Sequence, residues 1–211
     1  MGTQPTNLNS NKPKLAENRL TSHLSKYTIT LGSQSPRRKE LFAGLNLPFA
    51  VEVREVEEQY PTDIQVVNVP EYLAKLKAIP FRHDFKEDGL LITADTIVLI
   101  DGKVLGKPMD YQHAFEMLEL LSGKKHVVVT GICITSNEKQ ITFSDHTDVF
   151  FKTLSQEEID YYLTHYQPYD KAGSYGVQEW IGYVAIEKIE GSYFNVMGLP
   201  VQRLYEELLK F

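Results

Sequence analysis

Basic side chains open a predicted helix at residue 36, although the first turn of a helix normally favours acidic ones. Ser35 and Pro36 predict this helix start, because serine caps free N–H groups and proline suits the first helical position. Arg37 and Arg38 follow in the first turn, where the helix dipole disfavours each cation by up to ~1 kcal/mol. A bound anion reverses that sign, and guanidinium groups match phosphate oxygens. Together with Ser33, the stretch indicates a phosphate-binding cradle, and the alternative is a solvated basic turn.

Asp95 is the single carboxylate in residues 90–100, the most apolar segment of the chain. A carboxylate among apolar residues is costly unless it is paired, hydrogen-bonded or bound to a metal. We therefore expect Asp95 at a strand end that faces a cleft, as a metal ligand or a general base. The alternative is an aspartate that merely ends a strand or caps a turn.

A second carboxylate is available from an acidic stretch that contains Glu55, Glu57 and Glu58. Mg²⁺ prefers oxygen ligands and typically takes one or two protein carboxylates together with substrate phosphate. The acidic stretch is therefore a candidate for a metal ligand, although such runs are more often simply solvated.

Three further polar residues lie where they could reach a ligand. Lys107 follows a predicted hairpin, and we expect it to project into the same cleft as Asp95. Gln178 ends a glycine-rich loop, residues 170–178, and its amide can present a donor and an acceptor to a base edge. Thr96 either bonds a ligand or fills a β-branched strand position, and we expect Trp180 in the core.

The sequence lacks the motifs of P-loop proteins, zinc sites and serine hydrolases. Residues 102–107 superficially resemble a P-loop, but the stretch is one residue too short and Pro108 replaces the required serine or threonine. The six histidines show no zinc-binding spacing. No Gly-x-Ser-x-Gly motif is present, so Ser33 and Ser35 are poor candidates for a hydrolase nucleophile.

The composition also excludes several classes of protein. The chain of 211 residues has a net charge of −6, which argues against general nucleic-acid binding. No apolar run is long enough to span a membrane, and the N-terminal residues lack the apolar core of a signal peptide. Cys133 is the only cysteine, which suits a reducing cytoplasm. We therefore expect a cytoplasmic protein that binds neither nucleic acid nor membranes.

The elements that must position these residues alternate between strands and helices. Hairpins and single crossovers both occur, which predicts a mixed sheet flanked by helices. The composition of residues 1–13 predicts a disordered tail. A short helix is expected between this tail and the first strand. We expect strands at 27–30, 49–53, 90–100, 103–105, 126–135, 140–152, 181–188 and 192–196, and helices from Pro36, Pro70, Asp110, Ser155 and Pro200.

Seven stretches, in order along the chain, resemble the Maf (septum-formation inhibitor) family of nucleoside triphosphate pyrophosphatases. They are residues 33–41, 74–78, 94–96, 105–108, 121–123, 170–178 and 191–200. The resemblance implies one domain over 27–211, preceded by an extension over 1–26. It also implies an elongated, two-lobed α/β fold with a cleft, similar to that of inosine triphosphate pyrophosphatases. Two departures bear on base preference: Thr93 replaces a common glycine, and Glu179 with Trp180 replaces another.

The resemblance implies hydrolysis of a nucleoside triphosphate to the monophosphate and pyrophosphate, with Mg²⁺ or Mn²⁺ and usually as a homodimer. Asp95 corresponds to the proton acceptor of the family, and Asp95 and Glu58 would hold the metal. The substrate would contact Ser33, Arg37, Arg38, Lys77 and Lys107, whereas Arg37, Thr96 and Gln178 mark enzymes that act on dTTP and UTP.

Two other hypotheses remain open at this point. A nucleotide-binding regulator of cell division could use the same phosphate cradle without turnover, but it would not need Asp95 and Glu58 beside the phosphates. A pyrophosphatase for a modified purine nucleotide should differ at Arg37, Thr96 or Gln178. The pyrophosphatase hypothesis requires Arg37 and Asp95 to share one cleft.

Overall fold

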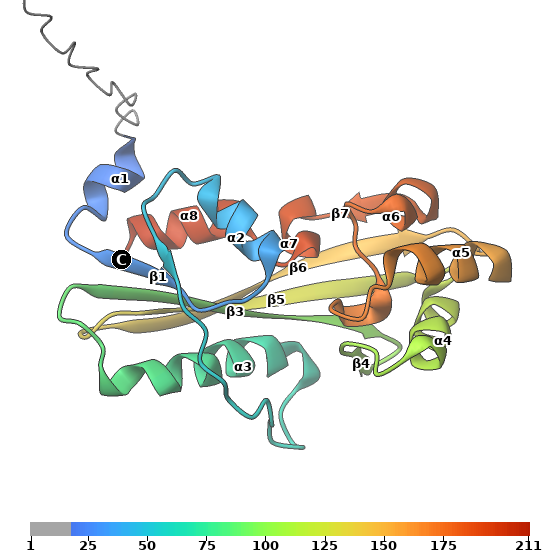
Figure 1. The fold of residues 1–211 in the computed structure, drawn as a ribbon, viewed down its shortest axis with the longest axis horizontal. Helices are drawn as coiled ribbons and strands as arrows, with labels where there is room; N and C mark the ends of the chain where they lie inside the picture. Colours follow the sequence, from blue (N-terminus) through green and yellow to red (C-terminus); the bar gives the residue numbers. More distant parts are fainter. Residues whose placement is uncertain (1–17) are drawn as a thin grey trace, which may run out of the picture.

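The computed structural model describes residues 18–211, which form one twisted, mixed sheet with helices on both faces (Figure 1). The strands are β1 (Thr28–Leu31), β2 (Ala50–Val51), β3 (Gly89–Ile100), β4 (Lys103–Leu105), β5 (Lys125–Thr135), β6 (Gln140–Phe151) and β7 (Ile186–Glu190). Their order is β2-β1-β3-β5-β6-β7, and β4 pairs with β3 off this path. β1 runs parallel to β2 and β3, whereas the other pairs are antiparallel. The predicted mixed sheet flanked by helices is confirmed.

Three helices begin at the capping residues that were predicted from the sequence. Ser35 accepts the backbone N–H of Arg38 at the start of α2 (Pro36–Ala43). Asp110 caps α4 (Tyr111–Leu121), and a reciprocal capping box of Ser155 opens α5 (Gln156–Tyr166). The other helices are α1 (Arg19–His23), η1 (Val66–Asn68), α3 (Val69–Ala78), η2 (Ile79–His83), η3 (Ala172–Ser174), α6 (Trp180–Ala185), α7 (Tyr193–Met197) and α8 (Val201–Leu209).

The two faces of β3 carry different cores, because successive side chains of a strand point to opposite sides. Leu91, Ile97 and Leu99 belong to clusters that pack against α3. Ile92 and Val98 face the other side of the sheet, where they belong to two separate clusters. Asp95 and Thr96 thus occupy the midpoint of the strand, one on each face.

The elongated shape follows from those two separate clusters (Figure 1). One contains Phe42 of α2 and Leu204 of α8, together with the first half of β3. The other contains Leu118 of α4 and Leu163 of α5, together with the second half of β3. The molecule therefore has two halves joined by long strands, which agrees with the expected two lobes.

One edge of β3 is free between the two halves. β1 pairs with β3 only as far as Ile92, and β4 pairs with it only from Val98 onward. Residues 93–97 therefore have no strand neighbour on this edge within the described part of the chain. Such a gap lets residues from both faces of β3 reach a common space.

The strand predicted at 192–196 is wrong, and the strand predicted at 181–188 is present only from residue 186, as β7. Residues 180–185 form α6 and residues 193–197 form α7, so that β7 is the only strand in this region of the described chain. Ser192 caps α7 by accepting the N–H of Asn195, and Gly198 ends it with a φ of 110°, which favours glycine. These local contacts override the β-branched and aromatic composition that favours strands.

Two of the predictions concern the N-terminal part of the chain. The disordered tail expected over residues 1–13 lies outside the described residues. The short helix expected before the first strand is present as α1, and its Leu20 is buried. No helix within residues 18–211 is both long and apolar enough to cross a membrane.

Candidate active site

A cleft of about 1200 Å³ opens at the free edge of β3. Arg37 and Asp95 both line it, as the pyrophosphatase hypothesis requires. The residues predicted for the site all line this one cleft: Ser33, Arg37, Arg38, Glu58, Lys77, Asp95, Thr96, Lys107 and Gln178.

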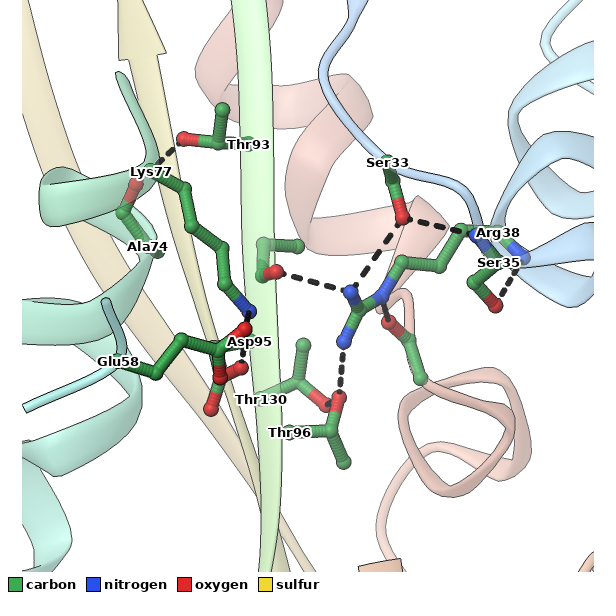
Figure 2. A network of polar contacts seen from close by, with 12 residues as sticks. Ser33, Ser35, Arg38, Glu58, Ala74, Lys77, Thr93, Asp95, Thr96 and Thr130 are labelled. Atoms are coloured by element: carbon green, nitrogen blue, oxygen red, sulfur yellow. Dashed lines mark hydrogen bonds and ion pairs between the residues drawn. The ribbon is translucent and has the colours of Figure 1, made fainter. Parts of the chain in front are cut away.

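Asp95 lies on the α3 side of the cleft, in contact with a lysine (Figure 2). Lys77 Nζ is 2.5 Å from Asp95 Oδ1 and 3.1 Å from Glu58 Oε1. Asp95 is only 8% exposed, and an ammonium group at this distance offsets the cost of burying its charge. Figure 2 shows the Lys77 side chain reaching from α3 towards both carboxylates.

The expectation that Asp95 ends a strand is wrong. Asp95 lies in the middle of β3, seven residues into a strand of 12. It reaches the cleft because β1 has already ended and β4 has not yet begun on that edge. The limited pairing of β1 and β4 with β3 thus leaves an opening in the middle of the strand, where a strand end is expected from the sequence.

Helix α3, which carries Lys77, is fixed to β3 by a buried hydrogen bond. The Thr93 hydroxyl donates to the carbonyl oxygen of Ala74 at 2.6 Å. Ala74 lies three residues before Lys77 on the same helix, so this bond sets the distance from the lysine to the strand. Thr93, one of the two departures from the family pattern, therefore has a positioning role.

Arg38 lies on the opposite face of β3, and its guanidinium group is held by the protein itself (Figure 2). It donates to the carbonyl oxygens of Ala94 and Gly198, both at 2.8 Å, and to Thr96 Oγ1 at 2.9 Å. A longer contact of 3.5 Å reaches Ser33 Oγ. Arg38 thus satisfies the carbonyl of Ala94 at the edge where β3 lacks a strand neighbour.

The charge of Arg38 persists despite its environment. Burial lowers the pKa of Arg38, and the nearby Asp95 carboxylate acts in the opposite direction. Arginine nonetheless stays protonated in proteins at any pH where they fold. Arg38 is therefore a fixed positive charge, and most of its N–H groups already have partners in the protein.

Arg37 crosses the mouth of the cleft to a residue that the sequence analysis did not assign. Its Nη1 is 2.8 Å from Asp170 Oδ2, in the glycine-rich loop of the other half. Burial raises the pKa of Asp170, but hydrogen bonds from Lys171 and Arg37 outweigh it and hold the pKa below its ordinary value. Asp170 is 57% exposed, and such exposed ion pairs contribute little to stability. A phosphate could therefore replace Asp170 as the partner of Arg37.

The signal that could have identified Asp170 is its place in the Asp-Lys pair at the start of the glycine-rich motif. Lys171 is buried and pairs with both Asp170, at 2.7 Å, and Glu179, at 3.0 Å. Glu179 also accepts a short hydrogen bond from Tyr162. The loop is therefore fixed to its own half by charges as well as by packing.

Gln178 and Lys107 complete the far wall of the cleft. Gln178 Oε1 is buried and has no hydrogen-bond partner within residues 18–211. A buried acceptor without a donor is costly, so a ligand N–H in this place would stabilise it. Lys107 is exposed at the rim. Trp180, expected in the core, is only partly buried and packs against Tyr161.

The carboxylates are suited to a divalent cation that arrives with other ligands. Within residues 18–211, no three His, Cys, Asp or Glu side chains lie close enough to hold a metal ion. Asp95 and Glu58, however, converge on one cation, the ammonium of Lys77. Mg²⁺ commonly takes two carboxylates and completes its shell with water and phosphate oxygens. The donor set therefore fits a hard divalent ion bound together with a phosphate ligand.

The fold and the cleft define an α/β protein in which cationic side chains face carboxylates at a gap in the sheet. Residues 28–211 match the family model described as Maf-like protein, and the chain belongs to this family.

Its relatives include curated proteins of similar length. The dTTP/UTP pyrophosphatase of Bacteroides thetaiotaomicron is 53% identical over 192 residues, which cover 90% of this chain and 100% of the relative. The dTTP/UTP pyrophosphatase of Porphyromonas gingivalis is 53% identical over 195 residues, 91% of this chain and 98% of the relative. Among solved structures, the Staphylococcus aureus Ham1 protein aligns with 59% of this chain and 71% of its own, at 16% identity and a TM-score of 0.42.

Proposed function

We propose that this protein is a nucleoside triphosphate pyrophosphatase, a hydrolase of phosphoric anhydrides that converts dTTP and UTP to the monophosphate and pyrophosphate. The observation that carries the proposal is the single cleft in which Arg37, Arg38 and Lys107 accompany Asp95 and Glu58. The curated relatives at 53% identity, which are named dTTP/UTP pyrophosphatases, support the same conclusion. A regulator without turnover would gain nothing from carboxylates beside a polyanion, because they repel it.

The proposed reaction is in-line attack of water on the α-phosphorus. Asp95 uses one carboxylate oxygen for Lys77, and the other is available to orient the water and accept its proton. A bond forms between the water oxygen and the α-phosphorus, and the bond from this phosphorus to the bridging oxygen breaks. Pyrophosphate leaves with its charge stabilised by Arg37, Arg38 and Lys107.

Asp95 and Glu58 are also the residues that would hold Mg²⁺ or Mn²⁺. A divalent cation bound there supplies positive charge to phosphate oxygens and so lowers the barrier to displacement. In this structure Lys77 supplies the positive charge between the two carboxylates.

Replacement of Lys77 by methionine should therefore expose a cation site. We expect Lys77→Met to bind Mn²⁺ about tenfold more tightly than the wild type in the absence of nucleotide, because two close carboxylates lose their counter-charge. Isothermal titration with Mn²⁺ alone measures this. Lys75→Met, on the same helix and outside the cleft, is the control. Equal Mn²⁺ affinity in Lys77→Met and the wild type would show that Asp95 and Glu58 are not a metal pair.

The proposed base preference depends on the edge that thymine and uracil share. Both bases carry an imide N–H between two carbonyl groups, whereas cytosine has an acceptor at the same ring position. The buried Gln178 Oε1, which has no partner in the described structure, is suited to accept that N–H. The exposed methyl of thymine lies away from this edge, which is consistent with action on both dTTP and UTP.

The proposal is tested by pyrophosphate release from dTTP, UTP, CTP, ATP and GTP, each with and without Mg²⁺ or Mn²⁺. We expect kcat/KM for dTTP and UTP to exceed that for ATP and GTP by about tenfold or more, because a site built around one hydrogen-bonding edge rejects others. Equal rates on all five would contradict the base preference. No release from any of them would favour the non-catalytic regulator. A modified purine nucleotide is measured beside these five, and faster release from it than from dTTP and UTP would favour a pyrophosphatase for modified purine nucleotides.

We also propose a reducing, cytoplasmic location, because the single cysteine, Cys133, is a buried free thiol. A homodimer and the absence of nucleic-acid partners stay predictions from the sequence and the family.

A further inference from the structure

A line of hydrogen bonds runs from Arg38 into the core beneath the cleft. Arg38 Nη2 lies 2.9 Å from Thr96 Oγ1, which lies 2.9 Å from Thr130 Oγ1 (Figure 2). Thr130 Oγ1 in turn lies 3.2 Å from the backbone oxygen of Asn195 in α7. Thr96 and Thr130 are paired residues of the neighbouring strands β3 and β5, so their side chains share one face. The line thus joins four residues from α2, β3, β5 and α7.

The chemistry of the groups fixes the direction of every bond in this line. A carbonyl oxygen only accepts, so the single hydroxyl proton of Thr130 is donated to Asn195. Thr130 Oγ1 must then accept the single hydroxyl proton of Thr96. Thr96 Oγ1 accepts in turn from Arg38, since a guanidinium group only donates. Donation therefore runs one way, from Arg38 to Thr96, to Thr130 and to Asn195.

This direction determines what Thr96 can offer a substrate. Its only proton is already donated to Thr130, so Thr96 has no hydrogen bond to donate to a ligand. Thr96 accepts a hydrogen bond from one nitrogen of the Arg38 guanidinium group. The other two nitrogens donate to backbone carbonyl oxygens. Thr96 thus acts on the orientation of a positive charge rather than as a donor to a base.

The inner end of the line is rigid. Thr130 and Asn195 are both 0% exposed. The Asn195 side chain donates to the Val128 carbonyl oxygen and to Thr147 Oγ1, both at 3.0 Å. Asn195 is thereby fixed to β5 and β6, so its backbone oxygen is a stationary acceptor. The donors of the Thr96, Thr130 and Asn195 side chains are all used, and only Asn195 Oδ1 has no partner within the described residues. Fixed donors of this kind restrict the outer end of the line to one geometry.

We propose that Thr130 is a positioning residue for polyphosphate binding, which acts through Thr96 on the guanidinium group of Arg38. The proposal rests on the proposed function only in naming the polyphosphate as the ligand of Arg38. Thr130 lies beneath the cleft wall and does not line the cleft itself, so its effect must be transmitted through the two residues above it.

The test compares Thr130→Val and Thr130→Ser with a matched control, Thr135→Val. Valine keeps the shape of threonine and removes the hydroxyl, whereas serine keeps the hydroxyl. Thr135 is buried on the same strand, and its hydroxyl bonds Gln140 and Cys133 away from the cleft. The readouts are the Kd of inorganic tripolyphosphate by calorimetry without metal, and kcat and KM for dTTP, UTP and ATP.

We expect Thr130→Val to weaken tripolyphosphate binding about tenfold, since the Thr96 proton loses its acceptor and the Arg38 orientation relaxes. KM should rise by the same factor for all three nucleotides, while kcat changes little. Thr130→Ser and Thr135→Val should stay within about twofold of the wild type. Thr96→Val should weaken tripolyphosphate binding as well, and adding Thr130→Val to it should have no further effect, because the line is already broken.

Three results would overturn the proposal. Thr130→Val could bind tripolyphosphate as the wild type does, Thr130→Ser could fail to restore binding, or the double variant could show the sum of the two single effects. If Thr130→Val does not fold, Thr96→Val decides by the same binding measurement. Because tripolyphosphate binding requires no turnover, a wild type that binds it but releases no pyrophosphate would contradict the proposed function and leave this comparison valid.

Discussion

Asp95→Asn is expected to lower kcat for pyrophosphate release from dTTP by about 10²–10⁴-fold, the range that general base catalysis contributes. Asparagine has the shape of aspartate and retains an oxygen for Lys77, but it cannot accept the proton of the attacking water. Binding of tripolyphosphate without metal should not weaken, because the variant removes a negative charge that repels the polyanion and leaves every cation in place. A coupled assay of pyrophosphate release under single-turnover conditions measures the chemical step directly.

The matched control is Asp101→Asn, in the turn that follows the same strand. Asp101 is exposed, pairs with Lys124 and does not line the cleft, so its rate should stay within about twofold of the wild type. If Asp95→Asn turns over dTTP at the wild-type rate, Asp95 is neither the base nor an essential ligand, and the proposed mechanism is wrong.

Gly131→Ala is expected to have a large effect on stability. Gly131 of β5 pairs with Asp95, and α3 crosses directly over it. A Cβ atom at this position would lie 2.2 Å from the Pro70 carbonyl carbon and 2.3 Å from Glu71 N, both of which are backbone atoms. Overpacking costs typically 1–3 kcal/mol and occasionally more, and backbone neighbours yield less than flexible side chains. We expect the free energy of unfolding to fall by about 3 kcal/mol, measured by urea denaturation.

The same substitution should also impair activity, because α3 carries Lys77 and must move away from the sheet. Gly106→Ala serves as the stability control, since a Cβ at Gly106 would meet no atom within 4 Å. It should alter the free energy of unfolding by no more than about 0.5 kcal/mol. A Gly131→Ala variant with the wild-type urea midpoint would show that α3 does not depend on close contact with β5.

The parts of the fold that could be predicted from sequence are those that depend on neighbouring residues. Ser35, Asp110 and Ser155 cap helices as predicted, because an N-cap acts on backbone groups two or three residues away. The long apolar segment around Asp95 forms a strand for the same reason. The helices at 180–185 and 193–197 were not predicted, since their composition favours strands. Ser192 caps the second of them, whereas the first has no side-chain cap and depends on its surroundings.

The site divides in the same way. Residue type and the family motif predict which side chains line the cleft, and all of them do. Pairing between distant segments decides how they are presented, which is why Asp95 reaches the cleft from mid-strand. The partners of Arg38 include the backbone oxygens of Ala94 and Gly198, which no side-chain pattern reveals. Thr130 gave no signal, because a threonine in a strand is an ordinary β-branched residue.

The central claim is that water, held by Asp95, attacks the α-phosphorus of a triphosphate whose anionic groups lie among Arg37, Arg38 and Lys107. The most direct test is hydrolysis of dTTP in water enriched in oxygen-18, with both products analysed by mass spectrometry. The proposed mechanism predicts the heavy oxygen in dTMP alone and unlabelled pyrophosphate. Label in pyrophosphate, or release of inorganic phosphate with dTDP, would place the attack at another phosphorus and contradict it.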